Sequence, residues 1–186
     1  MGMATWKNIL MNYRIEKNIL PKNCIDHIKS LINNLDFINA GDIVNSKINN
    51  IFTPNYIFQG MSRVTTDNIN INENNKLLYT RLNDFGFIIT SIVCEKAKIK
   101  IKNIDRFMWN LYKPNEEGTF HVDMVDSSFY TILYSFNDSD GYVQIGDKKI
   151  YDVENEAKIF KSNIKHKGVG PTKSNYRLNL NIVLQT

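Results

Sequence analysis

The chain has 186 residues, of which 42% are hydrophobic and 23% charged, and this length fits one domain that buries about two-thirds of its unfolded surface. It contains no run of about 18 apolar residues that could span a membrane, and its first residues lack the pattern of a secretory signal. The formal net charge is +4, but the 23 basic residues are interleaved with 19 acidic ones, which excludes a basic nucleic-acid-binding arm.

The first half of the chain predicts one short strand and two amphipathic helices. Residues 12–20 favour a strand that ends before a proline. Apolar residues then recur at three- and four-residue spacing over 22–35 and again over 73–96, which is typical of helices with one buried face. These apolar residues are Ile25, Ile28, Leu31, Ile32 and Leu35 in the first helix and Leu78, Leu82, Phe85, Ile89, Ile92 and Val93 in the second.

Two cysteines, Cys24 and Cys94, fall within the predicted helices. They are too few for a zinc knuckle or an iron–sulfur cluster, and we expect both to be reduced and largely buried. Residues 39–72, between the helices, are polar and irregular. We expect them to border the substrate site, together with the segment 124–128, and Arg63 and Asp126 are candidate substrate contacts.

Beyond residue 102 the sequence becomes rich in β-branched and aromatic residues, in at least six short segments separated by turn-forming residues. Because no helix separates these segments, they predict antiparallel pairing in a barrel or double-sheet jelly roll, with the two helices packed outside one sheet. We therefore expect one α+β, mainly β domain over 1–186, in which 1–103 support a jelly-roll core at 104–186. The segments are RFMWNLY, GTFHVDMV, SSFYTILYSF, GYVQIGDKKIYDV, AKIFKSN and RLNLNIVLQT.

Three residues in this region predict a metal site. His121 and Asp123 are two apart, so in a strand they project from the same face with Cα atoms about 6.5–7 Å apart. His166 joins them if its strand lies opposite in the jelly roll. Two histidines and one carboxylate form the facial triad of non-haem Fe(II) oxygenases, which leaves three coordination positions for a bidentate cosubstrate and dioxygen.

A fourth candidate, Arg177, begins the last predicted strand. Its side chain alternates with Asn179 and Asn181 on one face, while the intervening residues are apolar. A polar row in so hydrophobic a strand indicates a wet cavity, where a guanidinium can hold a carboxylate by two parallel hydrogen bonds.

The pattern of His121, Asp123, His166 and Arg177 resembles that of the 2-oxoglutarate/Fe(II)-dependent dioxygenases, and of their compact prolyl 4-hydroxylase-like branch in particular. IEKNILPKNCIDHIKSLI is similar to the opening strand, turn and first helix of that branch, LYKPNEEGTFHVD to its metal-binding entry, and DGYVQI to its Gly-Gly-x-Leu strand. The resemblance covers most of the chain and implies a double-stranded β-helix fold, with 2-oxoglutarate as cosubstrate.

The resemblance also implies roles for individual residues. His121, Asp123 and His166 are expected to bind Fe(II), and Arg177 the distal carboxylate of 2-oxoglutarate. Further contacts to the cosubstrate are expected from inward-facing residues on neighbouring strands. Ser135 stands where some relatives have tyrosine, and Asp140 replaces the first glycine of the Gly-Gly turn. The expected contacts come from Tyr112, Thr131, Ser135 and Asn179.

The function implied is hydroxylation of a peptidyl or free amino-acid side chain, coupled to decarboxylation of 2-oxoglutarate by O2 to succinate and CO2. Asp123 distinguishes the chain from related halogenases, which have a small residue there. One alternative is nucleobase demethylation, because RLNLNIV is similar to the Arg-x-Asn-x-Thr-x-Arg strand of alkylation-repair dioxygenases, although Val183 replaces the second arginine. A catalytic zinc site would leave Arg177 without a role, and a non-catalytic jelly-roll binding protein remains a further alternative.

The composition also bears on the source of the protein. The chain has 26 Asn and 25 Ile, residues with AT-rich codons, which indicates an AT-rich bacterial or phage genome. We expect a cytoplasmic protein, in a bacterium or a virus-infected host cell, that acts on an amino acid, peptide or protein. A nucleic-acid substrate ranks second, and no membrane partner is expected.

Overall fold

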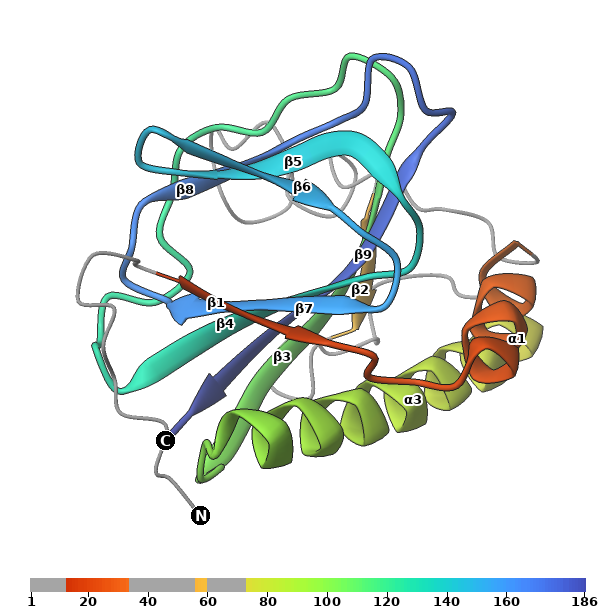
Figure 1. The fold of residues 1–186 in the computed structure, drawn as a ribbon. Helices are drawn as coiled ribbons and strands as arrows, with labels where there is room; N and C mark the ends of the chain where they lie inside the picture. The colour runs from red at the N-terminus through yellow and green to blue at the C-terminus, as the bar shows by residue number, and fades with distance from the viewer. Residues whose placement is uncertain (1–12, 34–55, 60–72) are drawn as a thin grey trace.

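The computed structural model describes residues 13–33, 56–59 and 73–186, which form two β-sheets and two helices (Figure 1). The larger sheet has six strands in the order β1-β7-β4-β9-β3-β2, and the smaller has three in the order β6-β5-β8. All strand pairs are antiparallel, as expected for a jelly roll. The strands are β1 (Tyr13–Lys17), β2 (Tyr56–Gln59), β3 (Asn103–Tyr112), β4 (Phe129–Ser135), β5 (Ser139–Ile145), β6 (Lys148–Asp152), β7 (Glu156–Lys161), β8 (His166–Val169) and β9 (Arg177–Gln185).

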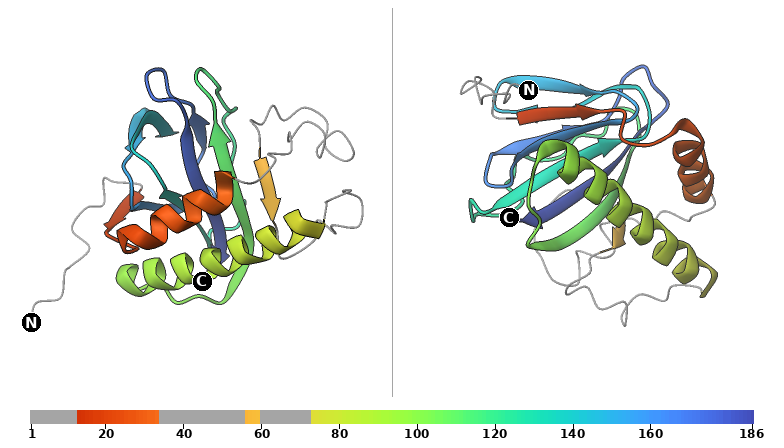
Figure 2. Two further views of the ribbon diagram at one scale, coloured as in Figure 1. Left: turned by 90° about the vertical axis from the view of Figure 1, so that its right-hand side faces the viewer. Right: turned by 60° about the horizontal axis from the view of Figure 1, so that its bottom comes forward.

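Both predicted helices are present and cover the face of the large sheet that points away from the small sheet (Figure 2). Helix α1 spans Lys22–Asn33 and helix α3 spans Glu73–Ala97. Their apolar stripes enter one core with the outward-facing residues of the large sheet, because the pleat of a strand alternates its side chains between two faces. The buried members from the helices are Ile25, Ile28, Leu31, Ile32, Leu82, Ile89 and Val93.

Both cysteines are free thiols: Cys94 is buried and Cys24 half-buried. Neither helix in the described part of the chain is long and apolar enough to cross a membrane. The candidate contact Arg63, and most of the predicted 39–72 border segment, lie outside the described residues.

The segment GTFHVDMV is not a strand, contrary to the prediction from its sequence. From Glu117 onward the chain runs along the free edge of β8 and forms two isolated bridges with that strand, Glu117 with Val169 and His121 with His166. Two residues further on, the backbone N–H of Asp123 donates instead to the carbonyl of Ser162 (3.0 Å). The segment therefore changes partner between the histidine and the aspartate, which a regular strand does not do.

A carboxylate on β5 fastens the loop that leads into β9. Asp140 accepts hydrogen bonds from the backbone N–H groups of Thr172, Lys173 and Ser174 (2.8–2.9 Å) and from the Thr172 hydroxyl (2.7 Å). The bond from the Thr172 side chain, followed by that from the Ser174 backbone, holds the pKa of Asp140 well below its usual range. The residue that replaces a glycine of the resembled family thus ties the start of β9 to β5.

We expect Asp140→Asn to lower the melting temperature by a few degrees at neutral pH, because an amide cannot accept this set of bonds. A carboxyl with a depressed folded-state pKa stabilises the protein fully above its unfolded pKa of about 3.9, and this stabilisation is lost as the pH falls. Thermal unfolding of the two proteins between pH 7 and pH 3 should therefore show a difference that narrows below about pH 4. A difference that stays constant over this range would contradict the assignment.

Candidate metal centre

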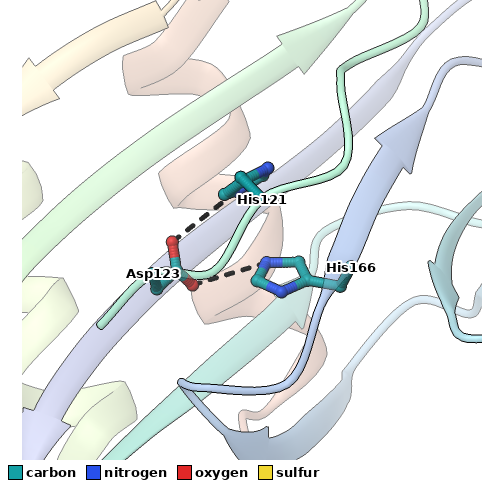
Figure 3. Close-up of side chains that lie close together, drawn as sticks. All are labelled: His121, Asp123 and His166. Atoms are coloured by element: carbon teal, nitrogen blue, oxygen red, sulfur yellow. Dashed lines mark ion pairs between the residues drawn. The ribbon is translucent and has the colours of Figure 1, made fainter. Parts of the chain in front are cut away.

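His121, Asp123 and His166 meet at one end of the space between the sheets (Figure 3), and their candidate ligand atoms all lie within 4.8 Å of one another. The Nε2 atom of His121 lies 3.7 Å from Oδ1 of Asp123, and that of His166 lies 3.5 Å from Oδ2. The sequence thus predicted that these three residues lie together, but it placed His121 and Asp123 in a strand, and they do not lie in one. The bridge between His121 and His166 aligns the two imidazoles, whose ring centres are 4.5 Å apart.

Backbone carbonyls orient both imidazoles. Nδ1 of His121 lies 2.9 Å from the carbonyl oxygen of Thr119, and Nδ1 of His166 lies 2.9 Å from that of Ile164. Since a carbonyl only accepts, Nδ1 carries the proton in each ring and Nε2 presents its lone pair toward Asp123. This arrangement is typical of histidines that bind metals.

The carboxylate of Asp123 is held from both sides. Arg106 on β3 donates to Oδ1, and the hydroxyl of Thr131 on β4 donates to Oδ2 at 2.7 Å. Burial alone would raise the pKa of Asp123, but the charge of Arg106, the two histidines and the Thr131 bond outweigh it and lower the pKa. A carboxylate has about four lone-pair directions, so these two bonds leave each oxygen able to bind a metal.

The protonation state of His166 also suits a metal ligand. The residue is buried, and burial lowers the pKa of its imidazole despite the attraction of the Asp123 carboxylate. It is therefore a neutral base near pH 7. Two neutral imidazole nitrogens and one ionised carboxylate oxygen are the donor set of the non-haem Fe(II) facial triad, so these residues fit that ion.

A narrow cavity extends from the triad between the sheets. Its free volume is small, about 20 Å³, which is the room for about one water molecule. A larger ligand therefore requires lining side chains to shift, and Met108 has a flexible side chain that can do so. The lining residues are Met108, Asn110, Tyr112, His121, Leu133, Val143, His166, Gly168, Arg177, Asn179 and Asn181.

Buried polar atoms without hydrogen-bond partners mark this cavity as a polar binding site. They include Nη1 of Arg177, Oδ1 of Asn110, Nδ2 of Asn179 and Oδ1 of Asn181. Leaving buried donors and acceptors unsatisfied is costly, so a set of them around one cavity indicates a polar ligand. Of these atoms, Nη1 of Arg177 and Nδ2 of Asn179 are donors and suit the carboxylates of a compound such as 2-oxoglutarate, which only accept hydrogen bonds.

Arg177 itself has a partner that the sequence did not reveal. It is buried, its Nε donates to Oδ2 of Asp152 (2.8 Å), and its Nη2 lies 3.4 Å from Oδ1 of the same carboxylate. Asp152 accepts a second cation, the buried Lys158, at 2.8 Å. Burial alone would raise the pKa of Asp152, but the charges of Arg177 and Lys158 lower it, so the carboxyl is ionised.

The other predicted site residues occupy different positions around the cavity. The ring of Tyr112 lies under the Arg177 guanidinium, with 4.7 Å from the ring centre to Cζ of Arg177. Asn179 accepts a hydrogen bond from Asn110 (3.0 Å).

Thr131 and Ser135 lie behind the cavity lining. Thr131 contacts Asp123, and Ser135 accepts a hydrogen bond from Lys158 (2.9 Å). Asp126, the candidate substrate contact, accepts from the backbone of Ser128 (2.8 Å).

Gly168 leaves the space in which Tyr112 and Arg177 meet. A Cβ atom at this position would lie 2.7 Å from Cζ of Tyr112, closer still to its hydroxyl, and 3.1 Å from Nη1 of Arg177. We expect Gly168→Ala to displace both side chains and to weaken the binding of a dicarboxylate in this cavity at least about tenfold, a cost of ~1.4 kcal/mol. Titration with 2-oxoglutarate tests this. Gly118→Ala is not a suitable control, because its Cβ would meet the backbone oxygen and nitrogen of Gly168 itself at 3.3 and 3.8 Å. Asp147→Ala, at an exposed position in the turn between β5 and β6, is the control and should leave binding unchanged.

No family model and no curated protein matches this sequence. Solved structures, however, share its fold. A prolyl hydroxylase from Trichoplax adhaerens, in complex with a hypoxia inducible factor peptide fragment, superposes with a TM-score of 0.64 at 16% identity, over 94% of this chain and 83% of that one. The viral collagen prolyl hydroxylase of Paramecium Bursaria Chlorella virus-1, in its 2-oxoglutarate complex, gives 0.52 at 14% identity, over 95% and 97%.

A third structure is HygX from Streptomyces hygroscopicus with nickel and 2-oxoglutarate bound, with a TM-score of 0.60 at 6% identity, over 94% of this chain and 82% of that one. At these identities the likeness establishes the fold. The chain has the mainly β, double-stranded β-helix fold of the 2-oxoglutarate/Fe(II) oxygenases, and prolyl hydroxylases are among its structural neighbours. The fold expected from the strand pattern and the family resemblance is confirmed.

Proposed function

We propose that this chain is a 2-oxoglutarate-dependent non-haem iron oxygenase that hydroxylates an amino-acid side chain, free or within a peptide. The observation that carries the proposal is a single cavity with the His121, Asp123 and His166 triad at one end and the unpaired Nη1 of a buried Arg177 in its wall. A 2-oxo dicarboxylate is a ligand that such a cavity suits, because it chelates a metal at one end and carries a carboxylate at the other.

The residues divide the work between them. The triad would hold Fe(II), with Arg106 and Thr131 fixing the Asp123 carboxylate and two carbonyls fixing the imidazoles. Arg177 would bind the distal carboxylate, and the unpaired Nδ2 of Asn179 would be a further donor to a carboxylate oxygen. Bound Fe(II) supplies the redox chemistry that couples decarboxylation of 2-oxoglutarate to succinate and CO2 with insertion of an oxygen atom from O2 into the substrate.

Exposed apolar residues flank the triad along the chain, and the structural neighbours support an amino-acid side chain as the substrate. His121 is itself partly exposed, and its neighbours Phe120 and Val122 are exposed apolar residues. Val125, two residues after Asp123, has 86% of its surface exposed. The ring of Phe120 lies under the ammonium groups of Lys167 and Lys165, at 4.8 and 5.9 Å from its centre, so these residues do not form a continuous apolar rim. Two of the structural neighbours are named as prolyl hydroxylases, and one of them was solved with a peptide.

The proposal is tested by adding Fe(II) and 2-oxoglutarate to the protein without oxygen and recording the weak visible charge-transfer band of the chelate. Admission of oxygen, with free amino acids and peptides as candidate substrates, should then yield succinate together with a product 16 Da heavier than its substrate. A folded protein that shows no band and forms no succinate would instead be a binding module. Succinate formation stimulated only by methylated nucleic acid would move the substrate to the demethylase class.

A further inference from the structure

A cluster of three buried charges lies behind the cavity. Lys158 on β7 is fully buried and donates to Asp152 (2.8 Å) and to the hydroxyl of Ser135 (2.9 Å). Asp152 on β6 in turn accepts from Nε of Arg177 at 2.8 Å. The three side chains come from different strands in both sheets and converge on one carboxylate. We call them the 152/158/177 cluster.

The charges in the 152/158/177 cluster do not balance. Two cations share one carboxylate, and no second carboxylate contacts either cation among the residues that the structure describes. The neighbouring Tyr112 does not supply a negative charge, because burial raises the pKa of its phenol. Burying a charge without a counter-charge is costly. The cluster therefore carries one surplus positive charge, next to a cavity that can admit an anion.

Asp152 and Lys158 have different roles toward Arg177, because only Asp152 contacts it. Asp152 engages the Nε side of the guanidinium and leaves Nη1, which lies at the Gly168 and Tyr112 side, without a carboxylate partner. Alone, Asp152 would also neutralise Arg177, and the cavity would lose its attraction for an anion. Lys158 prevents this because its ammonium neutralises Asp152 in turn.

This inference rests on the proposed function. We propose that Asp152 and Lys158 are positioning residues: Asp152 orients the guanidinium of Arg177, and Lys158 offsets the negative charge of Asp152. The positive charge of Arg177 then remains available to an anion, and the cavity selects 2-oxo acids with a distal carboxylate. The hydroxyl of Ser135 accepts a hydrogen bond from the Lys158 ammonium (2.9 Å). The small side chain of Ser135 leaves room for that ammonium. A merely structural ion cluster would affect the stability of the protein but not its choice between cosubstrates.

Two substitutions with opposite effects on charge test this. Lys158→Met keeps the length of the side chain and removes the surplus charge. Asp152→Asn increases that surplus, while its amide oxygen can still accept the bond from Nε of Arg177 and so keep the guanidinium oriented. In anaerobic Fe(II)-loaded protein, the preference for 2-oxoglutarate over 2-oxopentanoate, which lacks the distal carboxylate, should fall about tenfold or more in Lys158→Met and should rise in Asp152→Asn. The exposed Lys149, on the same strand as Asp152, gives the control Lys149→Met with an unchanged preference.

A second measurement needs no metal. Glutarate should raise the melting temperature of metal-free protein more than its uncharged diamide does, with a smaller shift in Lys158→Met and a larger one in Asp152→Asn. An unchanged preference and shift in Lys158→Met, or changes in the same direction in both variants, overturn the proposal. If Lys158→Met does not fold, Asp152→Asn decides alone: a preference equal to or below that of the wild type overturns it.

The outcome for the proposed function is read separately. A charge-dependent glutarate shift that requires Lys158, in a protein that never forms succinate, supports the role of the 152/158/177 cluster and contradicts the oxygenase. Normal succinate formation with a cosubstrate preference that is indifferent to Lys158 supports the oxygenase and contradicts the role of the cluster.

Discussion

Asp123→Ala should abolish both Fe(II) binding and 2-oxoglutarate-dependent succinate formation. Asp123 is the one ligand that faces both imidazoles, at 3.7 Å and 3.5 Å, and the only anionic donor of the triad. Without it, two neutral imidazoles remain beside the positive charge of Arg106, an environment that repels a divalent cation. We therefore expect activity at the background level rather than a partial loss.

The variant should remain folded, because the groups that Asp123 holds can find other partners. Arg106 is partly exposed and can be hydrated, and the Thr131 hydroxyl also contacts Ser162 (2.9 Å). Equilibrium dialysis of Fe(II) under anaerobic conditions, with circular dichroism to check the fold, measures the effect. Asp147→Ala, which removes an exposed carboxylate from the turn between β5 and β6, is the matched control and should bind Fe(II) normally. Undiminished binding by Asp123→Ala would place the metal elsewhere.

The sequence allowed the elements and the triad to be predicted because both depend on short patterns. Helical spacing found α1 and α3 to within two residues of their ends, and five of the six segments predicted for the jelly roll contain strands. The residue types of His121, Asp123 and His166 indicated a metal site even though the first two do not lie in a strand. Their proximity depends on the pairing of His121 with His166, which joins distant parts of the chain.

The 152/158/177 cluster could not be predicted in the same way. Asp152 and Lys158 are close in sequence, but the turn between them sends the chain from the small sheet to the large one, and they meet only because the sheets face each other. One signal was available. Lys158 alternates with Phe160 on one face of β7, opposite the face of Ala157 and Ile159, so a lysine was placed among buried positions. A lysine at a buried position indicates that an oppositely charged residue lies beside it, but the sequence does not show which residue that is.

Arg177→Ala should raise the concentration of 2-oxoglutarate required for half-maximal succinate formation by about a hundredfold, with a much smaller effect on the maximal rate. Hydrogen bonds to buried charged groups contribute about 1.5–3 kcal/mol, and about 1.4 kcal/mol corresponds to a factor of ten. The metal-chelating end of the cosubstrate does not depend on Arg177, so saturating 2-oxoglutarate should restore most of the rate.

We expect Arg177→Ala to remain folded, so that its effect on the cosubstrate can be measured. Asp152 keeps the ion pair with Lys158 at 2.8 Å, so removal of Arg177 does not leave an isolated buried carboxylate. Arg177→Lys separates charge from shape: an ammonium preserves the attraction but cannot form the planar fork, and its cosubstrate requirement should fall between those of the wild type and Arg177→Ala. The measurement is a titration of 2-oxoglutarate at fixed Fe(II) and O2. If both variants have the cosubstrate requirement of the wild type, the distal carboxylate is bound by another group and the cavity beside Gly168 is not its site.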